Sequence, residues 1–160
     1  MTATTSEITS GAKLAYRNLI GDQLWERLVH RLVRDEAIER DLAERIMNEA
    51  LGFLQLCARE PDGKFSPSAT VDIGWHVFVL YTKDYANFSQ RVAGRFLHHE
   101  PTDDPGTDYS DGFIPKQTMQ VMRKYGPVDE MLWTQAASCE GGGGGGGSSC
   151  HGGCDGGSCR

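Results

Sequence analysis

The sequence lacks the features that mark membrane, secreted and nucleic-acid-binding proteins. No apolar run approaches the roughly 20 residues that a helix needs to span a bilayer. Residues 1–10 show no basic segment followed by an apolar one, as a signal peptide would. Basic residues are the minority, with 16 Lys and Arg against 22 Asp and Glu and a net charge of −6. We therefore expect no membrane partner, no nucleic-acid partner and a cytoplasmic location.

Common catalytic signatures are missing as well. The sequence has no Gly-x-Ser-x-Gly elbow, no His-Glu-x-x-His motif and no dinucleotide fingerprint. The run Gly141–Gly147 is not a phosphate-binding loop, because it neither follows a strand nor opens a helix. These absences favour a non-enzymatic protein. The alternative that stays open is a metal-dependent enzyme that uses Asp72, His76, His98 and His99.

Apolar residues recur at helical spacing through most of the chain, and alternation with a period of two does not persist anywhere. This pattern predicts an all-α fold, a small bundle of five or six helices over residues 22–137. We expect a flexible N-terminus at 1–21 and a disordered Gly/Cys-rich tail at 138–160. The expected helices begin near Asp22, Glu36, Ala69, Thr82, Pro115 and Asp129.

One ionisable pair stands out within the apolar helix expected at residues 69–81. Asp72 and His76 are four residues apart, so both side chains project from one face of that helix. His98 and His99 follow the next expected helix, and an antiparallel arrangement would bring one of them near His76. A carboxylate with two histidines is a ligand set for zinc or non-haem iron.

Structural pairing is the simpler interpretation of Asp72 and His76. Buried His–Asp pairs often satisfy each other's hydrogen bonds and tie two helices together. Acid–base catalysis is a third possibility. His98 and His99 also suit an exposed helix end, where an imidazolium interacts well with the helix dipole.

A short and unusual motif surrounds Trp75: Asp72-x-x-Trp75-His76, followed by Leu80 and Tyr85. It resembles the central motif of the glycine-rich domain-containing protein-like family, known from plants and from small actinobacterial proteins. The likeness covers approximately residues 24–101, and the Gly/Cys-rich terminus at 139–160 adds to it. The plant pattern has a second His and a Pro where this chain has Phe78 and Thr82. The resemblance implies a fold but supplies no activity.

The tail combines glycine with thiols. Eleven of the last twenty residues are Gly, and four of the five cysteines lie at 139, 150, 154 and 159. In a reducing cytosol such thiols remain available as metal ligands. Our leading interpretation is that the tail binds a soft ion, Zn²⁺ or Cu(I). Its candidate ligands are Cys139, Cys150, His151, Cys154 and Cys159.

Two other interpretations of the tail stay open. Its Ser-Cys and Gly-Gly-Cys order resembles the core peptides of azole-containing microcin precursors, in which a modifying enzyme cyclises Ser and Cys onto the preceding carbonyl. Residues 141–160 would then be the core peptide and the body a large leader. Alternatively, the tail is a low-complexity segment with reactive thiols and no dedicated ligand.

Overall fold

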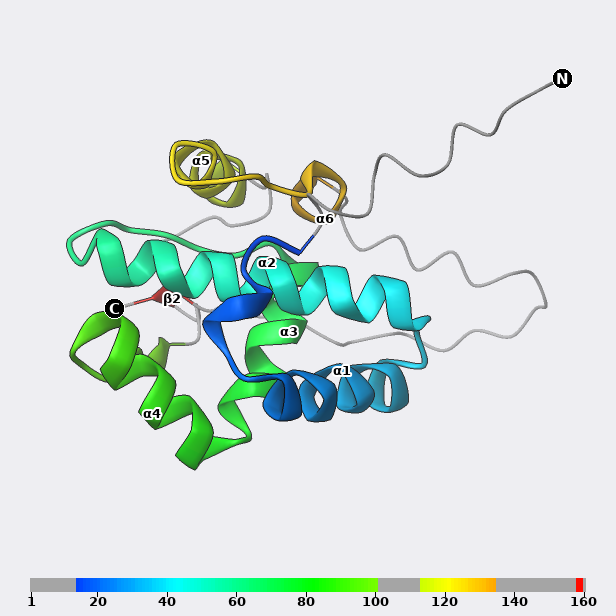
Figure 1. Ribbon diagram of the computed structural model, residues 1–160. Helices are drawn as coiled ribbons and strands as arrows, with labels where there is room; N and C mark the ends of the chain where they lie inside the picture. The colour runs from blue at the N-terminus through cyan, green and yellow to red at the C-terminus, as the bar shows by residue number, and fades with distance from the viewer. Residues whose placement is uncertain (1–13, 101–112, 135–157, 160) are drawn as a thin grey trace, which may run out of the picture.

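The computed structural model describes residues 14–100, 113–134 and 158–159, and these are predominantly helical (Figure 1). The predicted all-α class with five or six helices is confirmed. The predicted disordered tail lies outside the described residues, apart from 158–159. A 3₁₀ helix, η1 (Arg17–Leu19), precedes α1 (Asp22–Glu36), α2 (Arg40–Arg59), α3 (Ala69–Val79), α4 (Thr82–Ala93), α5 (Phe113–Met122) and α6 (Glu130–Thr134).

The α2 helix lies at the centre of the bundle. It contacts η1, α1, α3, α4 and α5, and it crosses the middle of the view in Figure 1. Twelve of its residues are buried, and they cover more than one face of the helix. A helix that is apolar on most of its circumference belongs in a protein core. The remaining helices therefore fold around α2.

Two left-handed residues set the ends of α1 and α4. Ala37 has φ 51° and ends α1, so α2 begins at Arg40 and not near Glu36 as predicted. Gly94 has φ 65° and ends α4, and glycine adopts this conformation without a steric penalty. The segment that follows Gly94 leads directly to His98 and His99.

The N-terminus of α3 is fixed from two sides. The Ser68 hydroxyl accepts a hydrogen bond from the Val71 N–H at 3.2 Å and donates one to the Leu132 carbonyl of α6. The helix begins at Ala69 as predicted, and its cap follows the usual preference for Ser. This double contact ties the first turn of α3, which includes Asp72, to another helix.

A glycine allows α3 to lie close against α2. A Cβ placed on Gly74 would come within 3.0 Å of the Ala50 Cβ and the Ile46 Cγ2. Any larger side chain would push the two helices apart. Gly74 thus sets the close α2–α3 packing that holds the helix carrying Asp72 and His76.

Residues just before α1 also pack on α2. Tyr16 and Ile20 are buried, and the Tyr16 N–H donates to the Asn48 Oδ1 at 2.9 Å. The segment predicted to be flexible, residues 1–21, is described only from residue 14, and this described part contacts the core.

Two very short strands are the only β-strands in the described residues. β1 (His99–Glu100) pairs antiparallel with β2 (Ser158–Cys159). In this register His99 lies opposite Cys159 and Glu100 opposite Ser158. The absence of a substantial sheet within the described ranges agrees with the sequence pattern.

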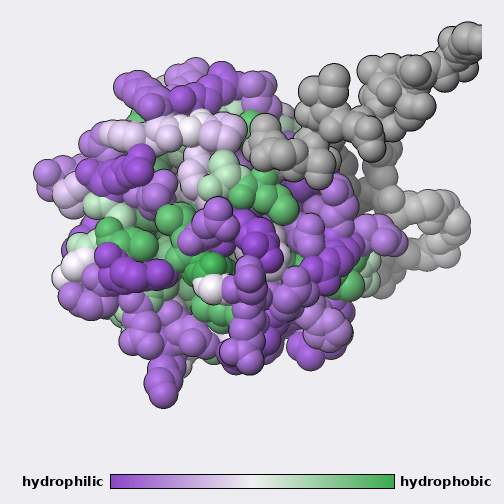
Figure 2. Space-filling view, viewed as in Figure 1, coloured by the Kyte–Doolittle hydropathy of each residue, from purple (hydrophilic) through white to green (hydrophobic). Residues whose placement is uncertain are grey.

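Among the described residues, no helix has both the length and the apolar character required to cross a membrane. Polar side chains predominate on the face shown in Figure 2, and hydrophobic ones gather mainly in its middle.

Candidate metal site

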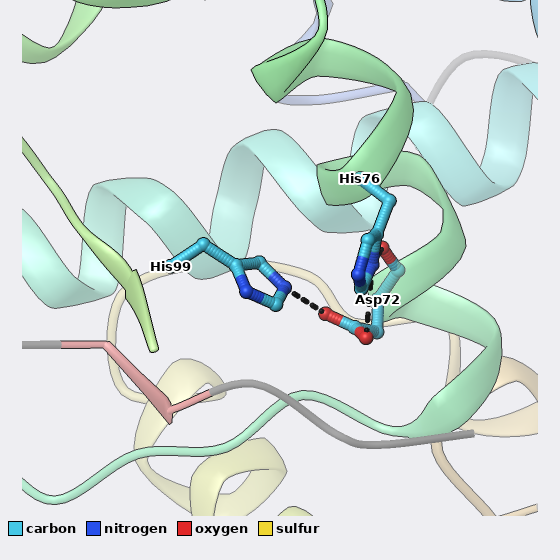
Figure 3. Close-up of side chains that lie close together, drawn as sticks. All are labelled: Asp72, His76 and His99. Carbon is cyan, nitrogen blue, oxygen red and sulfur yellow. Dashed lines mark hydrogen bonds and ion pairs between the residues drawn. The ribbon is translucent and has the colours of Figure 1, made fainter. Parts of the chain in front are cut away.

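Three side chains that bind metals in other proteins converge between α3 and β1 (Figure 3). Asp72 and His76 come from α3, and His99 comes from β1. One ligand atom from each of them lies within 4.8 Å of the other two. Within the described part of the chain, this is the one group of three or more His, Cys, Asp or Glu side chains arranged in this way.

Asp72 is the centre of the group. Its side chain is 7% exposed, and each carboxylate oxygen has one imidazole partner. The His76 Nδ1 lies 3.0 Å from Oδ2, and the His99 Nε2 lies 3.0 Å from Oδ1. The His76 Nδ1 is also 3.0 Å from the Asp72 backbone oxygen, four residues earlier in the helix.

Aromatic packing and a buried hydrogen-bond chain hold His99 in place. Its ring centroid lies 4.2 Å from that of Trp75 and 4.2 Å from that of His76. The Trp75 Nε1–H donates to the Tyr85 hydroxyl at 2.9 Å, which donates to the Leu97 carbonyl at 2.7 Å. This chain fixes the backbone two residues before His99. Trp75 is fully buried and forms one wall of the site.

The structure separates the two adjacent histidines. His99 joins the cluster, whereas His98 is exposed and its ring lies 4.9 Å from that of Phe96. One of these histidines was expected near His76, and the structure places His99 there, with the two ring centroids 4.2 Å apart. His98 lies outside the cluster.

The cysteines of the tail fall mostly outside the described residues. These are Cys139, Cys150 and Cys154, and the same applies to His151. The backbone of Cys159 is described and pairs with that of His99. Cys57 is buried on α2.

The cluster supports two kinds of chemistry. If the imidazoles carry N–H groups toward Asp72, they satisfy the carboxylate and tie β1 to α3. If their lone pairs face inward, the same atoms become ligands. Ligands about 2.0–2.1 Å from a tetrahedral zinc ion lie roughly 3.4 Å apart, which is close to the observed 3.0 Å contacts. His76 is 56% exposed, so solvent reaches one side of the cluster.

A second buried carboxylate, which was not predicted from the sequence, is Glu49 on α2, and it is 2% exposed. Its Oε2 accepts the Trp133 Nε1–H at 2.9 Å, and its Oε1 faces the Asn48 Nδ2 at 3.4 Å. Burial raises the pKa of Glu49 above its usual value, although these donors and the Asp129 backbone N–H lower it in part. The available signal was its spacing, four residues before Phe53 on the apolar stripe.

The fold and the cluster define a small helical protein with a carboxylate–histidine site between two of its elements. The chain belongs to the UCP032817-like family, whose model matches residues 17–112. The match covers all three residues of the cluster and ends before α5. No curated protein and no solved structure matches the chain.

This match corrects the resemblance drawn from the sequence. The glycine-rich domain-containing protein-like family was the wrong assignment. The short motif around Trp75 carried that resemblance, and local packing accounts for its Asp, Trp and His residues. Asp72 and His76 share a helix face, and Trp75 is buried against His99. The Gly/Cys-rich terminus that added to the likeness lies outside the matched residues.

Proposed function

We propose that this protein binds one divalent transition-metal ion through Asp72, His76 and His99. The convergence of one carboxylate and two imidazoles from α3 and β1 supports the proposal most strongly. Two nitrogen ligands with one oxygen ligand suit Zn²⁺ or Fe²⁺, whereas Mg²⁺ and Ca²⁺ prefer sites made of oxygen alone.

The exposure of His76 favours a metal over a purely structural pair. His99 is 12% exposed on its side chain, so its contact with Asp72 alone supplies a partner to both buried groups. His76 has water available to it and gains little from the same carboxylate. A bound ion gives the second imidazole a role, because it needs several ligands at once.

Three protein ligands leave at least one coordination position open. Catalytic zinc sites share this property, with water or substrate in the open position. The half-exposed His76 leaves that side accessible to solvent, which supports a metal-dependent enzyme as the second candidate. Loss of a hydrolytic or redox activity on metal removal would distinguish this enzyme from a binding protein.

The two functions proposed for the tail remain predictions. A metal site formed by the tail alone and an azole-type core peptide at residues 141–160 both rest on residues outside the described part of the chain. Intact mass from the native host tests the core peptide, since each azole removes one water and two further hydrogens. An unmodified mass beside an active cyclodehydratase would contradict it.

Zinc titration of the full-length protein under reducing conditions tests the body site. We expect Asp72→Ala, His76→Ala and His99→Ala to bind one ion fewer than the wild type, or to bind it much more weakly. His98→Ala is the matched control, because His98 is the neighbouring imidazole and lies outside the cluster. All variants carry the same tail, so any zinc bound there cancels in the comparison.

Circular dichroism shows whether each variant remains folded. His76→Ala is the most secure variant in this respect, because His76 is more than half exposed. Undiminished zinc binding by folded His76→Ala and His99→Ala would show that the cluster is a structural pair.

A further inference from the structure

A hydroxyl from a third helix joins the two elements that carry the candidate ligands. Two of the ligands come from α3, whereas His99 reaches them from β1 (Figure 3). Tyr85 lies on α4. Its hydroxyl accepts a hydrogen bond from the Trp75 Nε1–H of α3 at 2.9 Å and donates one to the Leu97 carbonyl at 2.7 Å. The hydroxyl therefore bridges the same two parts of the chain that must meet to form the site.

The chemistry of the bridged groups fixes the direction of both hydrogen bonds. An indole N–H only donates, and a backbone carbonyl only accepts. A group placed between them must accept from one and donate to the other, and a hydroxyl does both with one oxygen atom. Trp75, Tyr85 and Leu97 are all fully buried, so both bonds lie away from solvent. The Tyr85 hydroxyl thus satisfies two buried partners at once.

The bridge reaches His99 by two routes. The first runs through the backbone, because Leu97 precedes His99 by two residues and its carbonyl accepts the tyrosine proton. The second runs through the side chain of Trp75, whose ring centroid lies 4.2 Å from that of the imidazole. A hydrogen bond that orients the indole therefore also orients the wall against which His99 packs.

The Tyr85 ring is held in place independently of its hydroxyl. It packs edge-on against Phe78 and Phe96, with ring centroids 5.2 and 5.4 Å away and interplanar angles of 86° and 79°. These contacts need only the aromatic ring, so Tyr85→Phe keeps them and removes the bridge alone. The contribution of the hydroxyl can therefore be measured separately from the packing of the ring.

We propose that Tyr85 is a positioning residue of the metal site. Its hydroxyl holds His99 at the distance and orientation that let the imidazole bind an ion together with Asp72 and His76. Tyr85 acts through Trp75 and Leu97 and is not itself a ligand. This inference rests on the proposed function, because it requires an ion in the site. Partners that orient a ligand in this way typically change metal affinity by about 10- to 100-fold when they are removed.

Cobalt(II) titration of the full-length protein tests the inference, because the visible absorption of bound cobalt depends on the geometry of its ligands. The absorption of Asp72→Ala is subtracted to remove any cobalt bound outside the site. We expect Tyr85→Phe to bind one cobalt ion with a Kd about tenfold higher than that of the wild type, and with an altered absorption at saturation.

Tyr16→Phe is the matched control for this measurement. It removes another phenol-to-carbonyl hydrogen bond, from Tyr16 to Pro127 at 3.2 Å, outside the cluster. It should keep the Kd and the absorption of the wild type. A merely structural hydroxyl would change stability alone, whereas a positioning hydroxyl also changes the spectrum of the bound ion.

A second variant breaks the bridge from its other end and decides the question if Tyr85→Phe does not fold. Trp75→Phe removes the indole donor, so we expect it to raise the Kd for cobalt as well. Trp25→Phe is its control, because Trp25 is an almost equally buried indole on α1. Circular dichroism shows which variants are folded.

The outcomes separate this inference from the proposed function. The Kd and absorption of the wild type in folded Tyr85→Phe or Trp75→Phe would overturn the role of Tyr85 and leave the metal site intact. An equal loss of affinity in Tyr16→Phe would also overturn it, because the effect would then follow from stability alone. Equal cobalt binding by the wild type and Asp72→Ala would overturn the metal site itself.

Discussion

Two buried carboxylates lie on neighbouring helices of this protein and have different partners. Asp72 on α3 faces two imidazoles, whereas Glu49 on α2 faces the Trp133 indole and the Asn48 amide. Phe53 lies near both sites. The centroid of its ring is 5.3 Å from that of Trp75, beside Asp72, and 6.4 Å from that of Trp133, beside Glu49.

The difference between the partners distinguishes a purely structural carboxylate from one that can take part in binding a metal ion. An indole N–H is a donor only, so the contact with Trp133 satisfies Glu49 and offers no lone pair to a metal ion. An imidazole nitrogen is a donor or an acceptor according to its protonation, so the partners of Asp72 can become ligands. Burial alone therefore does not identify the functional carboxylate, and the chemistry of its partners does.

Removing the ring shared by the two sites should have the largest effect. Phe53 is fully buried, and Phe53→Ala would leave a cavity beside both Trp75 and Trp133. We expect a loss of about 3–5 kcal/mol in the free energy of unfolding. Urea denaturation measures it, with Leu80→Ala, at a side chain 60% exposed, as the control. A loss below about 1 kcal/mol would show that the two regions do not share a packed wall.

Removing the carboxylate of the candidate site should have the next largest effect on stability. Asp72→Ala leaves the mostly buried His99 without its partner, which we expect to cost about 1–3 kcal/mol in metal-free protein. Zinc at about one hundred times its Kd should stabilise the wild type by a further ~2.7 kcal/mol and the variant by nothing. Thermal denaturation with and without zinc checks both parts, and equal zinc stabilisation would refute the assignment.

Replacing the other carboxylate should change the pH dependence of stability. Because the pKa of Glu49 is raised, the folded state keeps its proton when the unfolded chain has lost it. The free energy of unfolding should therefore fall as pH rises from the ordinary value of 4.5 through the raised pKa. Glu49→Gln should remove this fall, and zinc binding should not change.

Chemical denaturation across that pH range measures the effect, and Glu36→Gln serves as the exposed control. A wild type whose pH dependence matches that of Glu49→Gln would mean that Glu49 is ionised at no cost in the folded protein.

The histidine outside the cluster should have the smallest effect. His98 is exposed, so we expect His98→Ala to change stability by less than about 0.5 kcal/mol and to leave zinc binding unaltered. Calorimetric titration of this variant sharpens the contrast with His99→Ala. A shared loss of zinc affinity would mean that both histidines serve the site.

The helices were predictable because their apolar residues repeat at helical spacing, and the contact between Asp72 and His76 follows from a separation of four residues on one helix. Which of His98 and His99 joins the cluster could not be predicted from the sequence. It depends on the turn at Gly94 and on the hydrogen bond from Tyr85 to the Leu97 carbonyl.

Other features depend on contacts that no local pattern encodes. The helix α2 begins later than predicted because Ala37, a residue without a special turn preference, adopts the left-handed conformation. Glu49 sits on the apolar stripe, but its donor Trp133 comes from a distant helix. The pairing of His99 with Cys159 joins segments on either side of α5 and α6.

Anomalous diffraction at the zinc absorption edge, from crystals of the full-length protein grown with zinc, tests the central claim most directly. It locates the ion without relying on a change in stability or affinity. The account predicts one strong peak within bonding distance of Asp72, His76 and His99. Zinc that binds elsewhere, with no peak between these three side chains, would contradict it.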